Sequence, residues 1–231
     1  MKNYFWRLLA LAYSCYAYCI DFIAPAYCAH CRVFLSDRTI YCTTCSDLIK
    51  SIASITLPLG NNYTMSVLAA SGYKEPLKSL ILAKTWSDYT ASKQLAQLIW
   101  QYSTLKNLSF DYLVPVPLHW TRKARRGYNQ AAVIAHELSL LSGKPTLDCV
   151  KRIKRTRFQS LLSGTARKHN VHNAFLLNLA LHDKISYENK TFVLVDDLMT
   201  TGATLQSMGK LLVPLKPCKI YGVVVCRVVA D

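Results

Sequence analysis

The fold class of this 231-residue chain is decided by Phe192-Val-Leu-Val-Asp-Asp-Leu-Met-Thr-Thr-Gly-Ala-Thr-Leu205. The run Thr191 to Val195 is continuously apolar, which predicts a strand buried on both faces of a sheet. Two carboxylates follow it, Asp196 and Asp197, and then a threonine-rich loop and a segment with helical apolar spacing. We therefore expect the strand to end at the acid pair. The loop would then lie at the carboxyl edge of a parallel sheet, where open α/β folds bind ligands.

The loop itself has the composition of a phosphate-binding turn. Gly202 lets the backbone pass close to a ligand, and the backbone N–H groups at a helix start can donate to an anion. The hydroxyls of Thr200, Thr201 and Thr204 add donors around Ala203. Because carboxylates would repel the phosphate, the acid pair fits the hydroxyls of an attached sugar, or a divalent cation. The simpler alternative is a capped turn with two solvent-facing acids.

Strands and helices alternate along the rest of the chain, which predicts a mostly parallel sheet flanked by helices. The other expected strands are Met65–Ala70, Asp111–Val116 and Ile220–Val229. A helix is expected from Pro76, and further helices from the apolar stripes at 95–102, 131–141 and 205–212. In the 131–141 helix, which Gly143 ends, His136 is expected to pack among apolar neighbours. The turn-rich residues 57–62 are expected to link an N-terminal unit, residues 1–56, to the α/β domain, residues 63–231.

Six of the nine cysteines precede residue 46, and four of these form two CxxC pairs, Cys28/Cys31 and Cys42/Cys45, ten residues apart. Two such pairs complete the four-sulfur site that zinc prefers. The alternatives are unrelated buried thiols or a redox CxxC. A zinc site of this kind points to a reducing compartment, so we expect a cytoplasmic protein.

Charge is concentrated in one window of the chain. The chain carries a formal charge of +15, and residues 117–172 hold twelve basic and two acidic residues. This excess suits a polyanionic partner, either a nucleic acid or a phosphorylated small molecule. The alternative is a solvated basic face that serves solubility.

The N-terminal segment Leu8–Ile20 has no charged residue and follows Lys2 and Arg7. It is too short for a membrane-spanning helix, and it lacks the small-residue cleavage site of a secretory signal. We expect an apolar helix that packs on the rest of the protein and no membrane span.

Residues 195–204 resemble the phosphoribosyl-pyrophosphate (PRPP) loop of type I phosphoribosyltransferases. The whole chain from about Pro25 is similar to the ComF family of competence proteins, which joins a small zinc finger to such a domain. The resemblance includes both cysteine pairs, Tyr73 with Pro76 and Lys84, Val114–Pro117, Arg126–Gln130, Gln159 with Leu162, Arg167 with Asn170, and Ala174-Phe175.

The resemblance implies a role for each matched segment. Asp196 and Asp197 would act as the catalytic pair that holds the ribose hydroxyls of PRPP, and Thr200, Thr201, Gly202, Ala203 and Thr204 would bind its 5-phosphate. Arg122, Arg125 and Arg126 would bind pyrophosphate, and Mg²⁺ would accompany PRPP. Residues 154–167 would form a loop that covers the site.

The family resemblance and the basic window together predict a protein that handles imported single-stranded DNA in natural transformation. Arg152, Lys154, Arg155 and Arg157 are the expected nucleic-acid contacts, and other DNA-uptake or recombination proteins are further expected partners. Two alternatives stay open: a non-catalytic module that senses PRPP, and a salvage phosphoribosyltransferase that acts on a free base. The acceptor of the phosphoribosyl group does not follow from the sequence.

Overall fold

The computed structural model describes residues 26–37, 39–83, 89–118, 127–153, 174–178 and 186–229. The chain divides into two compact units, Met1–Leu48 and Ile49–Asp231, which we call the cysteine unit and the α/β unit. The predicted apolar helix at Leu8–Ile20 lies outside the described residues. Within the described ranges, no helix combines the length and the apolar character needed to cross a membrane.

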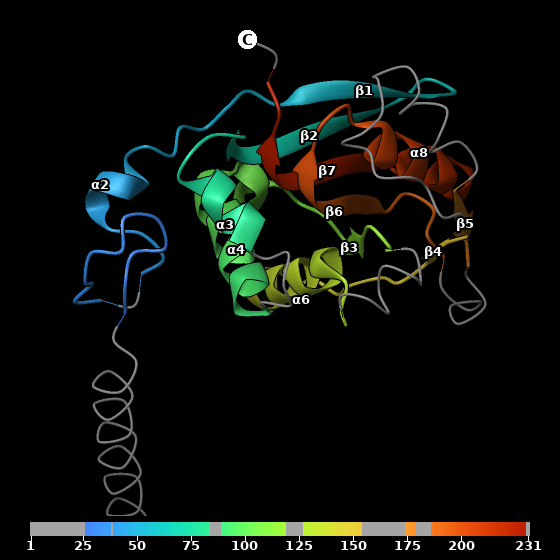
Figure 1. Cartoon of the computed structure of the whole chain (residues 1–231). Coiled ribbons are helices and arrows are strands. Elements are labelled where there is room, and N and C mark those ends of the chain that lie inside the picture. Colours follow the sequence, from blue (N-terminus) through green and yellow to red (C-terminus); the bar gives the residue numbers. More distant parts are fainter. Residues whose placement is uncertain are drawn as a thin grey trace, which may run out of the picture. The chain divides into compact units, whose positions relative to one another are not determined.

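The α/β unit is built on a five-stranded sheet with the order β1-β2-β7-β6-β3 (Figure 1). The strands are β1 (Ile55–Gly60), β2 (Tyr63–Gly72), β3 (Tyr112–Pro115), β6 (Thr191–Met199) and β7 (Lys219–Arg227). Only β1 runs antiparallel to its neighbour, β2, whereas β2, β7, β6 and β3 are parallel. The predicted mostly parallel sheet is therefore confirmed.

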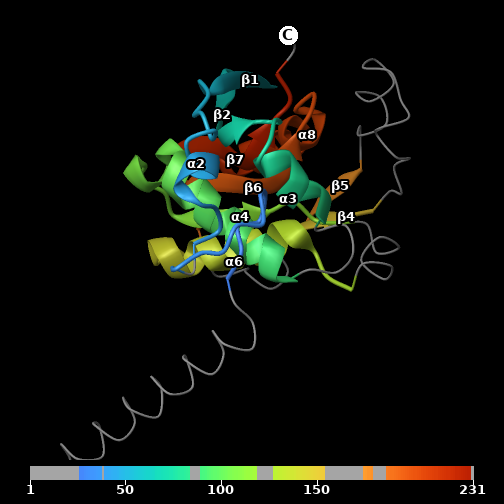
Figure 2. The same ribbon diagram turned by 60° about the vertical axis from the view of Figure 1, so that its left-hand side comes forward.

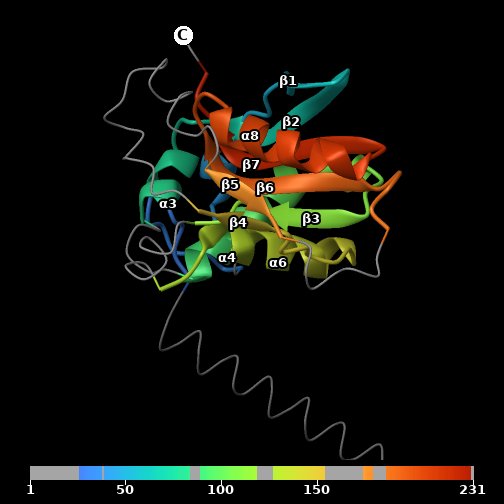
Figure 3. The same cartoon turned by 90° about the vertical axis from the view of Figure 1, so that its right-hand side faces the viewer.

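Helices cover both faces of this sheet. Helices α4 (Tyr89–Tyr102) and α6 (Gln130–Ser142) pack on one face, with α3 (Leu77–Ala83) against α4. Helix α8 (Ala203–Leu212) lies on the other side of the strands (Figures 1 and 3). Short 3-10 turns follow α4 at Thr104–Asn107 (η2) and α8 at Val213–Leu215 (η4). The core between α8 and the sheet contains the fully buried Phe192, Leu194 and Met208.

Residues 57–62 are not the expected linker. Residues 57–60 belong to β1, which pairs with β2, and Asn61 and Asn62 make the turn between them with φ values of 50° and 63°. Asparagine tolerates this left-handed conformation, and Pro58 is tolerated because β1 is an edge strand with a partner on one side only. Proline and glycine here mark an edge hairpin and not a boundary.

Strand β6 is longer than expected. Its pairing with β7 continues past Asp196, through Leu198 opposite Cys226, to Met199 opposite Arg227. The acid pair therefore lies inside the strand, because β7 supplies partners for three more residues, Asp196, Leu198 and Met199. The end of a strand that finishes in polar residues can be located only when the neighbouring strand is known.

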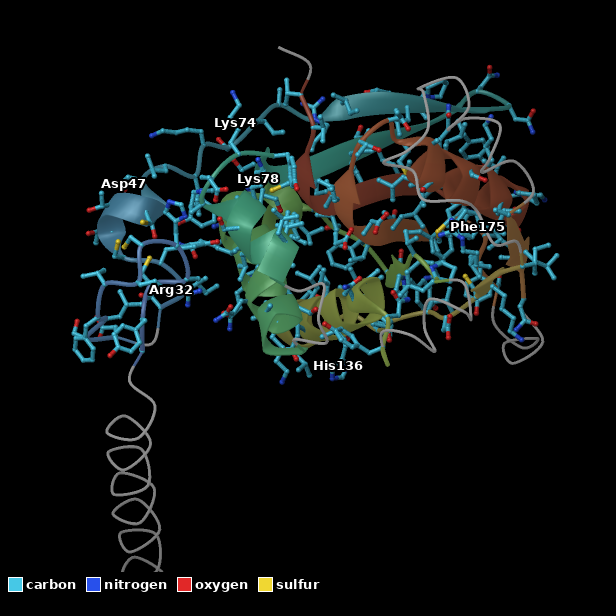
Figure 4. All side chains as sticks on the ribbon, viewed as in Figure 1. Arg32, Asp47, Lys74, Lys78, His136 and Phe175 are labelled. Atoms are coloured by element: carbon cyan, nitrogen blue, oxygen red, sulfur yellow. The ribbon has the colours of Figure 1, made fainter. Side chains whose placement is uncertain are left out.

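Helix α6 differs from the prediction at two positions. Ile134 and Leu138 are fully buried, and Gly143 ends the helix with a φ of 70°, as predicted. Leu141, however, is 44% exposed in the last turn. His136 is also exposed (Figure 4), because two residues turn a side chain by about 200° from the buried position of Ile134.

A second, two-stranded sheet was not predicted. It consists of β4 (Val150–Arg152) and β5 (Phe175–Leu177), which pair antiparallel and are separate from the main sheet (Figures 2 and 3). Val150 and Phe175 belong to the same apolar core as α8. Strands of three residues are too short to show an alternating pattern in the sequence.

The described part of the cysteine unit consists of two turns. In the first, Cys28 N–H donates to the Val33 carbonyl (2.9 Å), and Arg32 takes a positive φ of 65°. The second is the short helix α2 (Thr43–Ser46), which Cys42 precedes as the N-terminal cap residue. These turns bring two cysteine pairs that are distant in the sequence to one place.

Candidate functional site

The connection from β6 to α8 forms a hollow at the carboxyl edge of the sheet. Asp196 and residues 198–205 line it, around about 240 Å³ of empty space. The hollow thus collects Thr200, Thr201, Gly202, Ala203 and Thr204, which the sequence predicted to lie together. A strand followed directly by a helix places them there, because the chain must reverse direction at the sheet edge.

Gly202 is the residue that makes this turn possible. It takes a φ of 78° at the N-terminal cap of α8, which residues with a side chain rarely adopt. A Cβ atom at this position would lie 2.6 Å from Met199 Cε and 3.0 Å from Leu57 Cδ1. The backbone conformation therefore favours glycine, and any larger residue would also have to displace the ends of these two side chains.

The start of α8 can bind an anion. The hydrogen-bond ladder of the helix begins with Gln206 N–H, which donates to the Gly202 carbonyl (2.9 Å), and the N–H groups at the helix start lie outside this ladder. No side chain caps this helix start. The N–H groups and the positive end of the helix dipole favour a phosphate or a carboxylate here.

The two acids of the predicted pair have different surroundings. Asp196 lines the hollow, and its Oδ1 accepts a hydrogen bond from Asp197 N–H (2.9 Å). Asp197 does not line the hollow. Successive side chains of a strand point to opposite faces, so the acid pair spans both sides of the sheet edge.

Tyr73 lies near Asp197, and the sequence analysis gave it no role in the site. Its N–H donates to the Arg227 carbonyl at the end of β7 (2.9 Å). Burial raises the pKa of the Tyr73 phenol, and Cys226, Glu75 and Asp197 raise this pKa further. The phenol therefore keeps its proton near neutral pH and can donate a hydrogen bond beside the acid pair. Tyr73 directly follows β2 and lies three residues after the predicted strand Met65–Ala70, and this position is the signal that points to the sheet edge.

The predicted pyrophosphate-binding residues Arg122, Arg125 and Arg126 lie outside the described residues. The structure describes both ends of their segment. Val116 at one end pairs with β6 through Val116 N–H and the Val195 carbonyl (2.9 Å), and Asn129 at the other end donates from Nδ2 to the Val116 carbonyl (2.9 Å). The sequence analysis singled out neither Val116 nor Asn129 for this contact.

Of the predicted nucleic-acid contacts, only Arg152 is described; Lys154, Arg155 and Arg157, and the predicted covering loop at 154–167, lie outside the described residues. The Arg152 guanidinium lies over the ring of Phe175, 5.1 Å from its centroid, across the β4–β5 ribbon. This cation–π contact holds the side chain at the ribbon.

The four predicted metal ligands lie together. The Sγ atoms of Cys28, Cys31, Cys42 and Cys45 are all within 4.8 Å of one another, and Cys31 Sγ and Cys42 Sγ are 3.7 Å apart. Sulfur atoms gather beside α2 in Figure 4. A tetrahedral ion with bonds of about 2.3 Å to sulfur separates its ligands by about 3.8 Å. The cluster can therefore hold a metal ion.

Two thiols of this cluster, those of Cys28 and Cys45, differ in pKa. Burial works against ionisation of Cys28, but N–H groups of Cys42, Cys31 and His30 lower its pKa to about 6. Burial and the neighbouring sulfurs raise the pKa of Cys45 to about 12. Because a bound cation would offset the repulsion from the neighbouring sulfurs, metal binding would release a proton from Cys45.

The family of the chain follows from comparison with known proteins. A family model described as "Phosphoribosyl transferase domain" matches residues 86–231, which places the α/β unit in the phosphoribosyltransferase class. The chain is 33% identical to Competence protein F of Haemophilus influenzae over 193 residues, 80% of this chain and 78% of that protein. The chain therefore belongs to the ComF family.

Two further matches are more limited. DNA utilization protein YhgH of Escherichia coli K12 is 37% identical over 103 residues, 44% of this chain and 43% of that protein. A crystal structure of adenine phosphoribosyltransferase from Saccharomyces cerevisiae matches with a TM-score of 0.36 at 14% identity, covering 74% of this chain and 82% of that chain.

Proposed function

We propose that this chain is a PRPP-binding, phosphoribosyltransferase-like protein that acts on imported single-stranded DNA during natural transformation. The observation that carries the proposal is the hollow at residues 196–205, where an acid of β6, the positive φ of Gly202 and the uncapped start of α8 meet. Membership of the ComF family, with Competence protein F as a relative, supports the part in transformation.

PRPP fits this hollow through two kinds of contact. The 5-phosphate would accept hydrogen bonds from the backbone and hydroxyl groups of Thr200–Thr204 at the start of α8. Asp196 would accept from a ribose hydroxyl in the hollow, and Asp197, outside the hollow at the same strand end, would accept from the neighbouring hydroxyl, with the bond from Asp197 N–H fixing one oxygen of Asp196. This division keeps the carboxylates away from the phosphate, which they would repel.

Departure of pyrophosphate from the ribose requires neutralisation of its charge. Arg122, Arg125 and Arg126 would supply positive charge on the segment between Val116 and Asn129. Mg²⁺ would add charge neutralisation on the pyrophosphate oxygens, and the acid pair offers oxygen ligands of the kind that Mg²⁺ prefers.

We propose zinc as the metal of the cysteine unit. Four thiolates suit zinc, and they leave no position for a water or substrate, so the ion would be structural. The burial of Cys28 and Cys45 supports this role. Reduced thiols in such a site fit a cytoplasmic protein.

Single-stranded DNA would bind through the basic window, with contacts from Arg152, Lys154, Arg155 and Arg157. Tyr128 and Phe158 in the same window would offer rings for base stacking. Because two rings are few, charge would dominate the affinity and binding would show no sequence preference. Other DNA-uptake or recombination proteins would share this single-stranded substrate.

The deciding experiment measures PRPP binding by calorimetry and pyrophosphate release, each with Mg²⁺ and with or without single-stranded DNA. The expected result is PRPP binding, with pyrophosphate released and a glycosyl product formed. Binding without release under any condition would favour the PRPP-sensing module, and release only with a free base would favour the salvage enzyme. Absence of PRPP binding would overturn the proposal.

A further inference from the structure

One side of helix α8 lies against the edge strand β1. Gly202, Gln206 and Gly209 are spaced by four and three residues, so they share one side of the helix. Leu57 and Leu59 of β1 are two residues apart, so their side chains lie on the same face of that strand. The two elements pack on each other, although β2 and β7 separate β1 from β6 in the sheet. The helix that starts at the hollow is therefore also held by a strand that is distant in the sequence.

The two glycines allow β1 to approach α8 closely. A Cβ atom at position 209 would lie 2.7 Å from Leu59 Cδ2, and one at position 202 would lie 3.0 Å from Leu57 Cδ1. Glycine inside a helix is less stabilising than alanine. At Gly209 this loss of helix stability is accompanied by a close contact with β1, which a larger residue could make only by displacing the end of Leu59.

Gln206 lies between these glycines and bonds to both elements. Its backbone N–H donates to the Gly202 carbonyl (2.9 Å), and its side-chain Nε2 donates to the Pro58 carbonyl of β1 (2.7 Å). The residues between Gly202 and Gln206 line the hollow, whereas Gln206 itself does not. The side chain of Gln206 therefore fixes the helix end of the turn that forms the hollow.

Strand β1 is itself fixed by bonds that do not involve α8. It pairs with β2 along Ile55–Gly60. The chain before it is held by Ser71 Oγ, which donates to the Lys50 carbonyl (2.7 Å), and by Arg227 Nη2, which donates to the Ala53 carbonyl (3.0 Å). Because β1 is anchored in this way, a bond from Gln206 to β1 sets the position of the first turn of α8.

We propose that Gln206 is a positioning residue for the ribose phosphate end of PRPP; this inference rests on the proposed PRPP-binding function. Through Pro58, Gln206 fixes the first turn of α8 so that the N–H groups at the helix start point at the 5-phosphate. Its contribution is one of orientation and not of charge, because the amide is neutral. Linkage then requires a 5-phosphate ligand to strengthen the packing of β1 on α8 by the same factor by which this packing strengthens ligand binding.

The test measures the affinity of the variant Gln206→Met, which keeps the length of the side chain and removes the donor. Calorimetry with ribose 5-phosphate is expected to show about a threefold loss of affinity, because one hydrogen bond between neutral groups at the surface is lost. Gln206→Asn, whose amide is one methylene shorter and does not reach Pro58, should show the same loss. Gln101→Met is the matched control, since it makes the same chemical change at an exposed position of α4 and should leave the affinity unchanged.

Hydrogen exchange provides a second measurement, which a purely structural bond would not affect. Saturating ribose 5-phosphate is expected to slow the exchange of the β1 amides about threefold in the wild type, by the linkage above. The same ligand should not slow this exchange in Gln206→Met, because the connection between the helix start and β1 is lost.

Unchanged affinity in Gln206→Met, or an equal loss in Gln101→Met, would overturn the positioning role while the proposed function stands. Exchange of the wild-type β1 amides that does not respond to ribose 5-phosphate would also overturn it. A wild-type protein that binds neither PRPP nor ribose 5-phosphate would overturn the proposed function as well. If Gln206→Met does not fold, Gln206→Asn and the wild-type exchange measurement decide the question.

Discussion

The cysteine unit and the α/β unit differ in the interactions that stabilise each of them internally. Among the described residues of the cysteine unit, only Cys28, Leu35, Tyr41 and Cys45 are buried apolar side chains, and two of these belong to the sulfur cluster. Large side chains such as Phe34, 63% exposed, lie on its surface. The α/β unit instead buries apolar side chains on both faces of a sheet. We therefore expect the folding of the cysteine unit to depend on a metal ion, and that of the α/β unit on the burial of apolar side chains.

The difference extends to the relation between stability and function. In the cysteine unit, the side chains proposed to bind the metal are also those that hold the turns together. In the α/β unit, Phe192 lies in the core while Asp196, four residues later on the same strand, lies at the edge of the hollow. In the α/β unit, a substitution should therefore change either the stability of the fold or the binding of the ligand. In the cysteine unit, a substitution of a metal ligand should change both stability and metal binding.

The largest effect is expected from Cys42→Ser. Loss of one of four ligands should abolish zinc binding and unfold the cysteine unit, because structural zinc contributes on the order of 10 kcal/mol to such a site. The α/β unit should stay folded. Elemental analysis and circular dichroism measure the two effects, with Cys218→Ser as control, since Cys218 is exposed and outside the cluster. Wild-type protein purified without chelator and free of zinc would contradict the zinc assignment.

The second largest effect is expected on the stability of the α/β unit, from a substitution in its core. Phe192 is completely buried and stacks on Tyr112, with ring centroids 5.8 Å apart. Phe192→Ala should lower the free energy of unfolding by about 3–5 kcal/mol, as measured by urea denaturation, and leave the zinc content unchanged. Phe34→Ala is the control, expected to cost less than about 0.5 kcal/mol because this ring is exposed. Zinc loss in the Phe192 variant would show that the two units do not fold separately.

A smaller effect is expected on the free energy of PRPP binding, from substitution of either residue of the acid pair. Asp196→Ala or Asp197→Ala should weaken PRPP binding about ten- to a hundredfold, because each removes a charged acceptor worth about 1.5–3 kcal/mol. Calorimetry measures the affinity, and Asp148→Ala, at an exposed acid elsewhere in the unit, should leave it unchanged. Unaltered PRPP affinity in the double variant would exclude the site.

The smallest effect is expected on the affinity for single-stranded DNA, from charge reversal in the basic window. Reversal of Arg152, Lys154 and Arg155 to Glu should lower affinity about equally for every sequence. Binding to the wild type should weaken with salt by about 0.7 log unit per log unit of salt for each phosphate contact. Fluorescence anisotropy measures both.

The control carries an equal charge change at three exposed lysines near the ends of α8 and β7, Lys210, Lys216 and Lys219. Equal losses in the two triple variants would mean that net charge, and not the basic window, governs DNA binding. A flat salt response would exclude the electrostatic mode, and loss of PRPP binding instead of DNA binding would assign the three residues to PRPP.

Local patterns were enough to predict the central elements. The run at Thr191–Val195, the threonine loop with Gly202 and the helix after it follow each other in the chain. Burial, turn chemistry and helix periodicity can therefore all be recognised within the single stretch 191–212. The four cysteines were also identified correctly as one cluster, because CxxC spacing already brings two sulfurs together within each turn.

The edges of elements were predicted poorly. Pro58 and Gly60 suggested a linker, yet an edge strand accepts both. The end of β6 was placed at Asp196, although β7 continues to pair with it as far as Met199. In each case the outcome depends on a neighbouring strand that is distant in the sequence.

The sequence by itself determined the class of fold, the cysteine cluster and the loop that can bind phosphate, because each depends on residues close together in the chain. Only the tertiary structure decided that Asp196 lines the hollow and Asp197 does not, that Tyr73 lies near Asp197, and that Asn129 donates to the Val116 carbonyl beyond the end of β3. These relations join strands and helices separated by many residues. Hydrogen bonds across a sheet edge depend on register and distance, which no local pattern of residues contains.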